Sequence, residues 1–235
     1  MNLINKNITF RFAHKDDISL IMKFIKKYWK KNHLCGTNRK IFEYEYCHHA
    51  KVNFMIAFNK KNKKINAIQG FIPYSNSKKN LHICGSILLV RPDVTLPFLG
   101  IETMKNMLEK KKPKSYCGIG TNPLNTKPLV EKFFNRYTSK MVHHYFLNEN
   151  IKEFKIANIS KKFQHKSIKE KFFYEKILTF KEVINKIKLN KIYKNLPFKS
   201  SSYIKKRYFE NPSFKYEFFI INKKSLLIGR EIYLR

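Results

Sequence analysis

The sequence predicts an α/β (α+β) fold in which a mixed, mostly antiparallel sheet is flanked by helices on both faces. Short apolar segments of strand length recur through the first 150 residues. Segments whose apolar residues follow helical spacing lie between them. Two of the strand-like segments are joined by the charged turn KKNKK, which predicts an antiparallel hairpin.

The N-terminal part of the chain predicts a strand, two helical segments and a second strand. Residues 8–12, ITFRF, alternate apolar and polar side chains as a half-buried strand does. From Asp16 to about Asn32 the apolar residues recur at helical spacing, and the aspartates at the start favour a helix N-terminus. A short helical or irregular segment at 38–49 then precedes the apolar run VNFMIAF at 52–58.

The residues that follow predict four more strands and two more helices. The predicted strands are residues 65–75, 82–90, 115–120 and 143–148. The predicted helices are residues 98–110 and 122–134. The second of these opens with Asn122 as a cap and a proline at the first helical position.

Length and composition favour a folded protein of the cytoplasm. The chain has 235 residues, of which 43% are hydrophobic and 15% aromatic, enough for a packed core. The N-terminal residues lack the apolar run of a signal peptide, and no stretch of about 18 uncharged apolar residues occurs. We therefore expect a cytoplasmic location and no transmembrane segment.

The formal net charge of +33 points to a polyanionic partner such as nucleic acid as one alternative. Of the 49 basic residues, 42 are lysine and seven are arginine, although arginine is favoured for bidentate contacts to phosphates and bases. The lysines are also spread along the whole chain. We interpret the charge as a solvated surface, and nucleic-acid binding stays the alternative.

The four cysteines form no Cys-x-x-Cys pair, and in a reducing compartment we expect them to stay as thiols. They are Cys35, Cys47, Cys84 and Cys117. His33, His48 and His49 lie near the first two, but this spacing fits no zinc pattern. We therefore expect neither a disulfide framework nor a metal site.

Three motifs and their order resemble the Gcn5-related N-acetyltransferase (GNAT) superfamily over residues 8–148. ITFRFAHKDDISLIMKF resembles the first strand and helix of that family. LLVRP at 88–92 resembles its splayed fourth strand, and GIGTNPLNTKPLVEKFF at 118–134 resembles the next strand and helix. The resemblance implies a GNAT-like sheet and an acyl-CoA-dependent N-acyltransferase that uses acetyl-CoA or another acyl-CoA.

The family grips the pantetheine arm with the backbone of the fourth strand and surrounds the pyrophosphate with a glycine-rich turn before a helix. The residues that the resemblance assigns to the cofactor are Leu89, Val90, Arg91, Gly100, Ile101 and Asn122. Glu102 departs from the family pattern because it stands at the usual place of a glycine. Val130 departs too, because it occupies the place of a tyrosine that protonates the leaving thiolate in many members.

Amine acylation needs a base, an oxyanion donor and a proton for the thiolate. Glu43 and His82 are the candidate bases, and Tyr137 is the tyrosine nearest to the place of Val130. Contacts to the acceptor are assigned to His33, Tyr74 and His143, with His33 also a candidate base and His144 an alternative to His143. The expected acceptor is a small amine, such as an amino-sugar nucleotide.

A Trp and a His after the first helix, the strand GFIP and the segment HHYFLN resemble GNAT-like proteins of bacterial surface-sugar biosynthesis. Such proteins often continue into a second, related half. We therefore predict a GNAT-like domain at 1–150 and a partial second GNAT-like domain at 151–235, whose open sheet edges favour self-association. The alternatives are a degenerate, noncatalytic binding protein or truncated remnant, and a nucleic-acid-binding protein.

Overall fold

The structure, a computed structural model, describes residues 6–48, 50–75, 77, 79–142, 173–187, 197 and 199–232. The chain divides into two compact units. The first contains residues 1–136 and 189–213, and the second contains residues 137–188 and 214–235. Among the described residues, no helix is long and apolar enough to cross a lipid bilayer.

The first unit contains a five-stranded sheet in the order β1-β4-β5-β6-β7. Its strands are β1 (Ile8–Phe12), β4 (Phe54–Asn59), β5 (Lys64–Pro73), β6 (His82–Val90) and β7 (Ser115–Gly118). The first three pairings are antiparallel and the β6–β7 pairing is parallel. This mixed, mostly antiparallel sheet confirms the predicted fold class, and the hairpin across KKNKK is present as expected.

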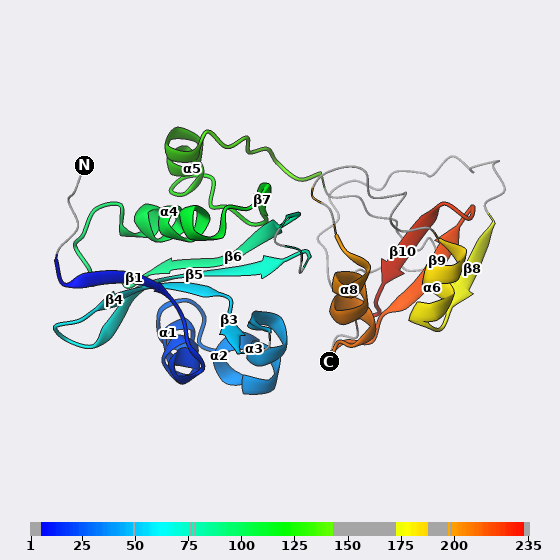
Figure 1. The fold of residues 1–235 in the computed structure, drawn as a ribbon, viewed down its shortest axis with the longest axis horizontal. Helices are drawn as coiled ribbons and strands as arrows, with labels where there is room; N and C mark the ends of the chain where they lie inside the picture. Colours follow the sequence, from blue (N-terminus) through cyan, green and yellow to red (C-terminus); the bar gives the residue numbers. More distant parts are fainter. Residues whose placement is uncertain are drawn as a thin grey trace, which may run out of the picture. The chain divides into compact units, whose positions relative to one another are not determined.

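Helices cover both faces of this sheet (Figure 1). One face carries α1 (Ile18–Tyr28), α2 (Leu34–Thr37) and α3 (Arg39–Tyr46), and the other carries α4 (Leu99–Lys111) and α5 (Lys127–Phe134). A two-stranded ribbon of β2 (Cys47–His48) and β3 (Lys51–Val52) follows α3. Burial on both faces explains why β4 reads as a continuous apolar run rather than an alternating one.

Side chains of β4 show the two cores directly. Phe54 and Ile56 pack into the core under α1 and α3, whereas Met55 and Ala57 pack into the cores under α4. All four side chains are fully buried. The alternation follows from the two-residue repeat of a strand.

The first helix ends earlier than predicted. A 3-10 turn, η1 (Lys15–Asp17), precedes α1, and α1 stops at Tyr28 instead of near Asn32. The backbone N–H groups of Trp29 and Lys30 both reach Ile25 O, which closes the last turn. His33 then caps α2 by accepting a hydrogen bond from Cys35 N at 3.2 Å.

The segment from 115 to 134 also differs from the prediction in its boundaries. β7 ends at Gly118, and Gly120 has a φ of 80°, which terminates the extended backbone. The helix begins at Lys127 rather than at Asn122, because Oδ1 of Asn122 accepts the N–H groups of Leu124 and Asn125 in a turn. The strand predicted at 143–148 lies outside the described residues.

The second unit contains an antiparallel sheet in the order β10-β9-β8. Its elements are β8 (Tyr174–Ile177), α6 (Phe180–Lys186), β9 (Glu217–Ile221) and β10 (Ser225–Gly229). The helical residues α8 (Ser201–Ile204) and the π-helical η2 (Lys205–Phe209) belong to the first unit. The assignment of residues 151–235 to a partial second GNAT-like domain stays a prediction.

Candidate functional site

The parallel strands β6 and β7 pair over only four positions. The ladder begins with His82 opposite Ser115 and ends with Gly85 opposite Gly118. β6 continues to Val90, whereas β7 ends at Gly118. Beyond Gly85, the edge of β6 that pairs with β7 therefore has no partner strand among the described strands. Its backbone N–H and C=O groups can bind an extended ligand. We call the place where the two strands part the fork.

A β-bulge in β6 lies directly at the fork. Gly85 pairs with Phe71 and Leu88 pairs with Gln69, so that two residues of β6, Ser86 and Ile87, stand opposite one residue of β5. A bulge bends its strand and increases the local twist. This bend gives a physical reason for β6 to separate from β7 at this point.

The first turn of α4 lies close to the end of β6. A Cβ atom added at Gly100 would be 3.1 Å from Cγ2 of Val90, so a larger residue there would press on the strand. Leu99 and Val90 share one apolar cluster, and Ile101 is buried. Unpaired N–H groups at a helix start favour anions, but Glu102 adds a carboxylate to the first turn.

Tyr116 of β7 lies at the fork on the face that α4 covers. A Cβ atom at Gly85 would be 2.5 Å from Cζ of Tyr116 and closer still to its hydroxyl oxygen, so the phenol rests on Gly85. The guanidinium carbon of Arg136 is 5.0 Å from the ring centroid. Burial raises the pKa of Tyr116 to about 12, so the phenol keeps its proton at neutral pH.

The opposite face of β6 and β7 carries two pairs of polar side chains, which we call the thiol face. Nδ1 of His82 is 2.7 Å from the hydroxyl oxygen of Ser115. On the next rung of the same face, Cys84 stands opposite Cys117. Burial is the main cause that lowers the pKa of His82, which keeps the imidazole neutral.

Tyr74 covers the thiol face from the end of β5. Its hydroxyl oxygen is 3.5 Å from Sγ of Cys117, and the Tyr203 ring packs edge-on against its own ring at 5.0 Å. Nζ of Lys199 is 5.4 Å from the Tyr74 ring centroid. The structure thus brings together two residues that the sequence singled out, Tyr74 and His82, with two cysteines that the sequence analysis expected only to stay as thiols.

A polar pocket of about 280 Å³ lies beside the thiol face. It is lined by α3, the end of β5 and the segment from Ser200 to Glu210, and Tyr203 belongs to both the pocket and the Tyr74 contact. Its charged lining residues are Glu45, Lys205, Lys206, Arg207 and Glu210. A pocket with both signs of charge and several hydroxyl groups suits a small polar molecule.

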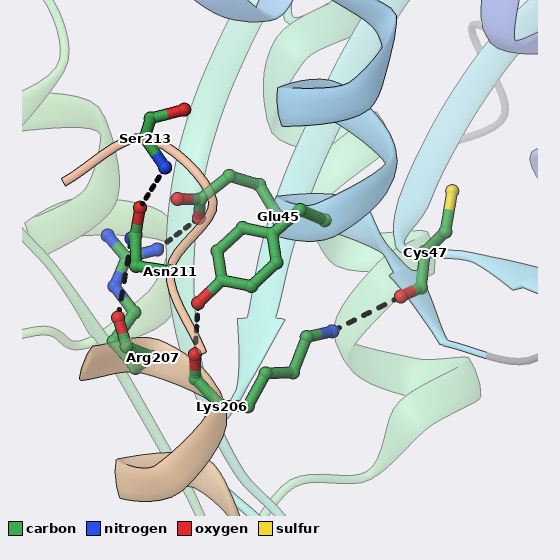
Figure 2. A network of polar contacts seen from close by, with 7 residues as sticks. Glu45, Cys47, Lys206, Arg207, Asn211 and Ser213 are labelled. Atoms are coloured by element: carbon green, nitrogen blue, oxygen red, sulfur yellow. Dashed lines mark hydrogen bonds and ion pairs between the residues drawn. The ribbon is translucent and has the colours of Figure 1, made fainter. Parts of the chain in front are cut away.

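A network of polar contacts fastens η2 to α3 (Figure 2). The Arg207 guanidinium donates to the Glu45 carboxylate, and the Tyr44 hydroxyl donates to the carbonyl oxygen of Lys206. Nζ of Lys206 donates to the carbonyl oxygen of Cys47 at 3.3 Å, and burial is the main cause that lowers the pKa of this lysine.

Several predicted catalytic and acceptor residues lie elsewhere. Glu43 pairs with Arg39 on the exposed side of α3, with Nε and Oε1 2.7 Å apart. His33 caps α2, and its ring stacks on that of Trp29 at 4.6 Å. Tyr137 is 91% exposed and belongs to the second unit. His143, with its alternative His144, lies outside the described residues.

The predicted cofactor residues divide between the two faces of the sheet. Val90 packs towards α4, whereas Leu89 packs against the core under α1. Arg91 lines a shallow pocket with lysines of α1 and of the β4–β5 hairpin, and its Nε is 2.7 Å from Oδ1 of Asp93. Asn122 shapes the turn before α5.

Sequence reasoning missed Tyr116, the rung of Cys84 and Cys117, and the pocket. The sequence does contain a signal for Tyr116, because strand alternation places its side chain on the face of the sheet opposite that of Cys117. No local signal connects residues 44–48 with 200–210, which are far apart in the chain. Among the described residues, no group of three or more His, Cys, Asp or Glu side chains is placed to hold a metal ion.

No family model and no curated protein matches the sequence. Similar solved structures include an acetyltransferase of Trypanosoma brucei, with 11% identity and a TM-score of 0.42, over 59% of this chain and 99% of that one. Aminoglycoside N-acetyltransferase AAC(6')-Iy in complex with CoA has 11% identity and a TM-score of 0.45, over 61% of this chain and 97% of that one. A predicted acetyltransferase from Clostridium acetobutylicum with acetyl-CoA has 13% identity and a TM-score of 0.43, over 59% of this chain and 96% of that one.

Proposed function

We propose that this protein is an acyl-CoA-dependent N-acyltransferase that moves an acetyl group from acetyl-CoA to a small amine. The observation that carries the proposal is the fork, where β6 continues past the end of its pairing with β7. The pantetheine arm is an extended chain with two amides, and such a chain can add to an open strand edge through backbone hydrogen bonds. This is the use of the fourth strand that the resemblance implies.

The groups around the fork suit acyl transfer. A backbone N–H of β6 beyond the bulge would stabilise the oxyanion that develops when the amine attacks the thioester carbonyl. The C–S bond then breaks, and the Tyr116 phenol would give its proton to the departing CoA thiolate. Tyr116 would thus supply what Val130, a buried apolar residue, cannot. His82 and Glu43 stay predictions for the base that deprotonates the amine.

The direct test is calorimetric titration of the full chain with acetyl-CoA at moderate ionic strength. A Cβ atom at Gly118 meets nothing closer than the carbonyl oxygen of Gly85 at 4.0 Å, so Gly118→Leu can add bulk beside the fork. We expect saturable binding by the unmodified chain and at least about tenfold weaker binding by the variant, a difference of about 1.4 kcal/mol.

Gly229→Leu is the matched control for this titration. Gly229 also lies in a strand and has open space around its Cβ position, but it belongs to the second unit. Its variant should bind acetyl-CoA as the unmodified chain does. Equal binding by both leucine variants would mean that the lysine-rich surface attracts the anionic cofactor, and it would contradict the proposal.

Tyr116→Phe tests the proton donor. With an amine acceptor found by screening, we expect the release of CoA thiol to slow by about 100-fold while affinity for acetyl-CoA stays unchanged, because the phenol acts only as the thiolate leaves. Tyr137→Phe tests the tyrosine that the sequence predicted for this role, and we expect no change in rate because Tyr137 is almost fully exposed. Equal rates for Tyr116→Phe and the unmodified chain would exclude the phenol from the reaction.

The polar pocket beside the thiol face is the proposed acceptor site. Its carboxylates are paired with Arg207 and Lys205, and its serine and tyrosine hydroxyls suit the hydroxyl groups of a sugar. We further propose an amino-sugar or its nucleotide derivative as acceptor, in surface-polysaccharide synthesis in the cytoplasm.

Glu102 and Val130 favour a second candidate function, that of a noncatalytic GNAT-like binding protein. Turnover of acetyl-CoA with any screened amine would exclude this second candidate.

A further inference from the structure

Cys84 and Cys117 face each other across the parallel strands β6 and β7. They are partners in the ladder register, on the rung just before Gly85 and Gly118. Neighbouring strands lie about 4.7–4.9 Å apart, which is within the Cα separation of about 4.4–6.8 Å that a disulfide requires. The ladder register therefore places the two cysteines within reach of a disulfide.

The surroundings favour an ionised thiol at Cys117. The Tyr74 hydroxyl lies 3.5 Å from its Sγ, and the ammonium group of Lys199 lies over the Tyr74 ring. The neighbouring Cys84 side chain is the largest cause that lowers the pKa of Cys117, and the Tyr74 hydroxyl and Lys199 lower it further, against burial, which raises it. The Cys117 side chain in turn raises the pKa of Cys84, which stays a protonated thiol and donates to the carbonyl oxygen of Gly85 at 3.4 Å.

The other two cysteines lack this combination. Cys35 is buried, and burial raises the pKa of its thiol to about 11. Cys47 is partly exposed, as Cys84 and Cys117 are, but burial is the main cause that raises its pKa. A thiolate with a second thiol beside it is the arrangement found in redox-sensing cysteine pairs.

We propose that Cys84 and Cys117 form a peroxide-sensitive thiol pair that closes reversibly into a disulfide. The Cys117 thiolate attacks one oxygen of a hydroperoxide, the O–O bond breaks, and the product is a sulfenic acid plus hydroxide, or alkoxide from an organic peroxide. The Cys84 thiol then attacks this sulfur, the S–O bond breaks, and water leaves as the disulfide forms. The peroxide is reduced by two electrons, and a dithiol reductant restores the two thiols.

Oxidation would change the site that adjoins the pair. Tyr74 would lose the thiolate beside its hydroxyl, and a covalent link would join β6 and β7 one rung before the fork. Tyr74 also contacts Tyr203, which lines the polar pocket. The proposal concerns the reactivity of the thiols alone, so it holds whether or not the fork binds acetyl-CoA.

The test is thiol mapping of the full chain after treatment with a few equivalents of hydrogen peroxide. The sample is alkylated with N-ethylmaleimide, digested and analysed by mass spectrometry, with and without later reduction by dithiothreitol. We expect Cys84 and Cys117 to lose alkylation together and regain it on reduction, while Cys35 and Cys47 keep it. Before oxidation, Cys117 should react with iodoacetamide at least about tenfold faster than Cys47 at pH 7.

Three variants separate the steps. Cys84→Ser should leave a sulfenic acid on Cys117 that dimedone traps, and Cys117→Ser should leave Cys84 reduced at the same dose. Tyr74→Phe should slow alkylation of Cys117 severalfold, because it removes a hydrogen bond to the thiolate. The proposal would be overturned if all four thiols of the oxidised, unmodified chain could still be alkylated, or if the disulfide joined two chains. It would also be overturned if Cys84 were oxidised in Cys117→Ser as much as in the unmodified chain.

Discussion

Gly85→Ala is expected to destabilise the first unit by about 1–3 kcal/mol, because the added methyl group must enter space that the Tyr116 ring occupies. The Cβ position lies 2.5 Å from Cζ of Tyr116, and the hydroxyl oxygen of Tyr116 is closer still. Either the ring or the strand has to move. Chemical denaturation followed by fluorescence of Trp29, the only tryptophan, reports on this unit.

Gly118→Ala is the matched control, since Gly118 stands on the same rung and has open space at its Cβ position. We expect this variant to be neutral or stabilised by about 0.4–1 kcal/mol, because alanine restricts the unfolded chain more than glycine does. Adding Tyr116→Leu to Gly85→Ala should recover part of the loss. Equal denaturation midpoints for Gly85→Ala and Gly118→Ala would show that Tyr116 does not rest on Gly85.

Asp17→Asn is the second change with a large expected effect, a loss of about 1.5–3 kcal/mol. Arg11 binds the carboxylate with two hydrogen bonds, Nη1 to Oδ2 at 2.6 Å and Nη2 to Oδ1 at 2.9 Å. The N–H of His14 donates to Oδ2 at 2.8 Å, and only 8% of the Asp17 side chain is exposed. An amide accepts fewer of these bonds and carries no charge to balance Arg11.

The exposed pair of Arg39 and Glu43 is the control for this variant, because its side chains are 55% and 44% exposed. Glu43→Gln should cost less than about 0.5 kcal/mol, as pairs one helical turn apart usually do. Denaturation midpoints of the two variants give the comparison. A loss as small for Asp17→Asn as for Glu43→Gln would mean that the corner between β1 and α1 does not depend on the carboxylate.

The same carboxylate predicts the direction of a pH effect. Burial of Asp17 opposes ionisation, but the hydrogen bonds from Arg11 and from the His14 N–H outweigh it, and the pKa of Asp17 is lowered. Its stabilising effect is therefore complete above the unfolded pKa of about 3.9 and is lost as the pH falls through the lower folded pKa. The stability gap between the unmodified chain and Asp17→Asn should narrow in acid and stay constant near neutral pH.

The sequence by itself determined the kinds of elements and most of their order. The strands at 8–12 and 82–90 match β1 and β6, because strand periodicity is a local property of the side chains. The helix at 98–110 differs from α4 by one residue at each end. The predicted ends of an element were wrong where a side chain makes a local hydrogen bond that apolar periodicity does not report. Asn122 makes such a bond in the turn before α5.

The tertiary structure decided which residues meet. Register places Cys84 opposite Cys117 and sets Gly85 under Tyr116, and a shift of one residue would move each side chain to the other face of the sheet. Docking of η2 on α3 depends on Arg207 and Glu45, which are 162 residues apart. Such contacts depend on how distant segments pack, whereas the periodicity of a sequence describes only neighbours along the chain.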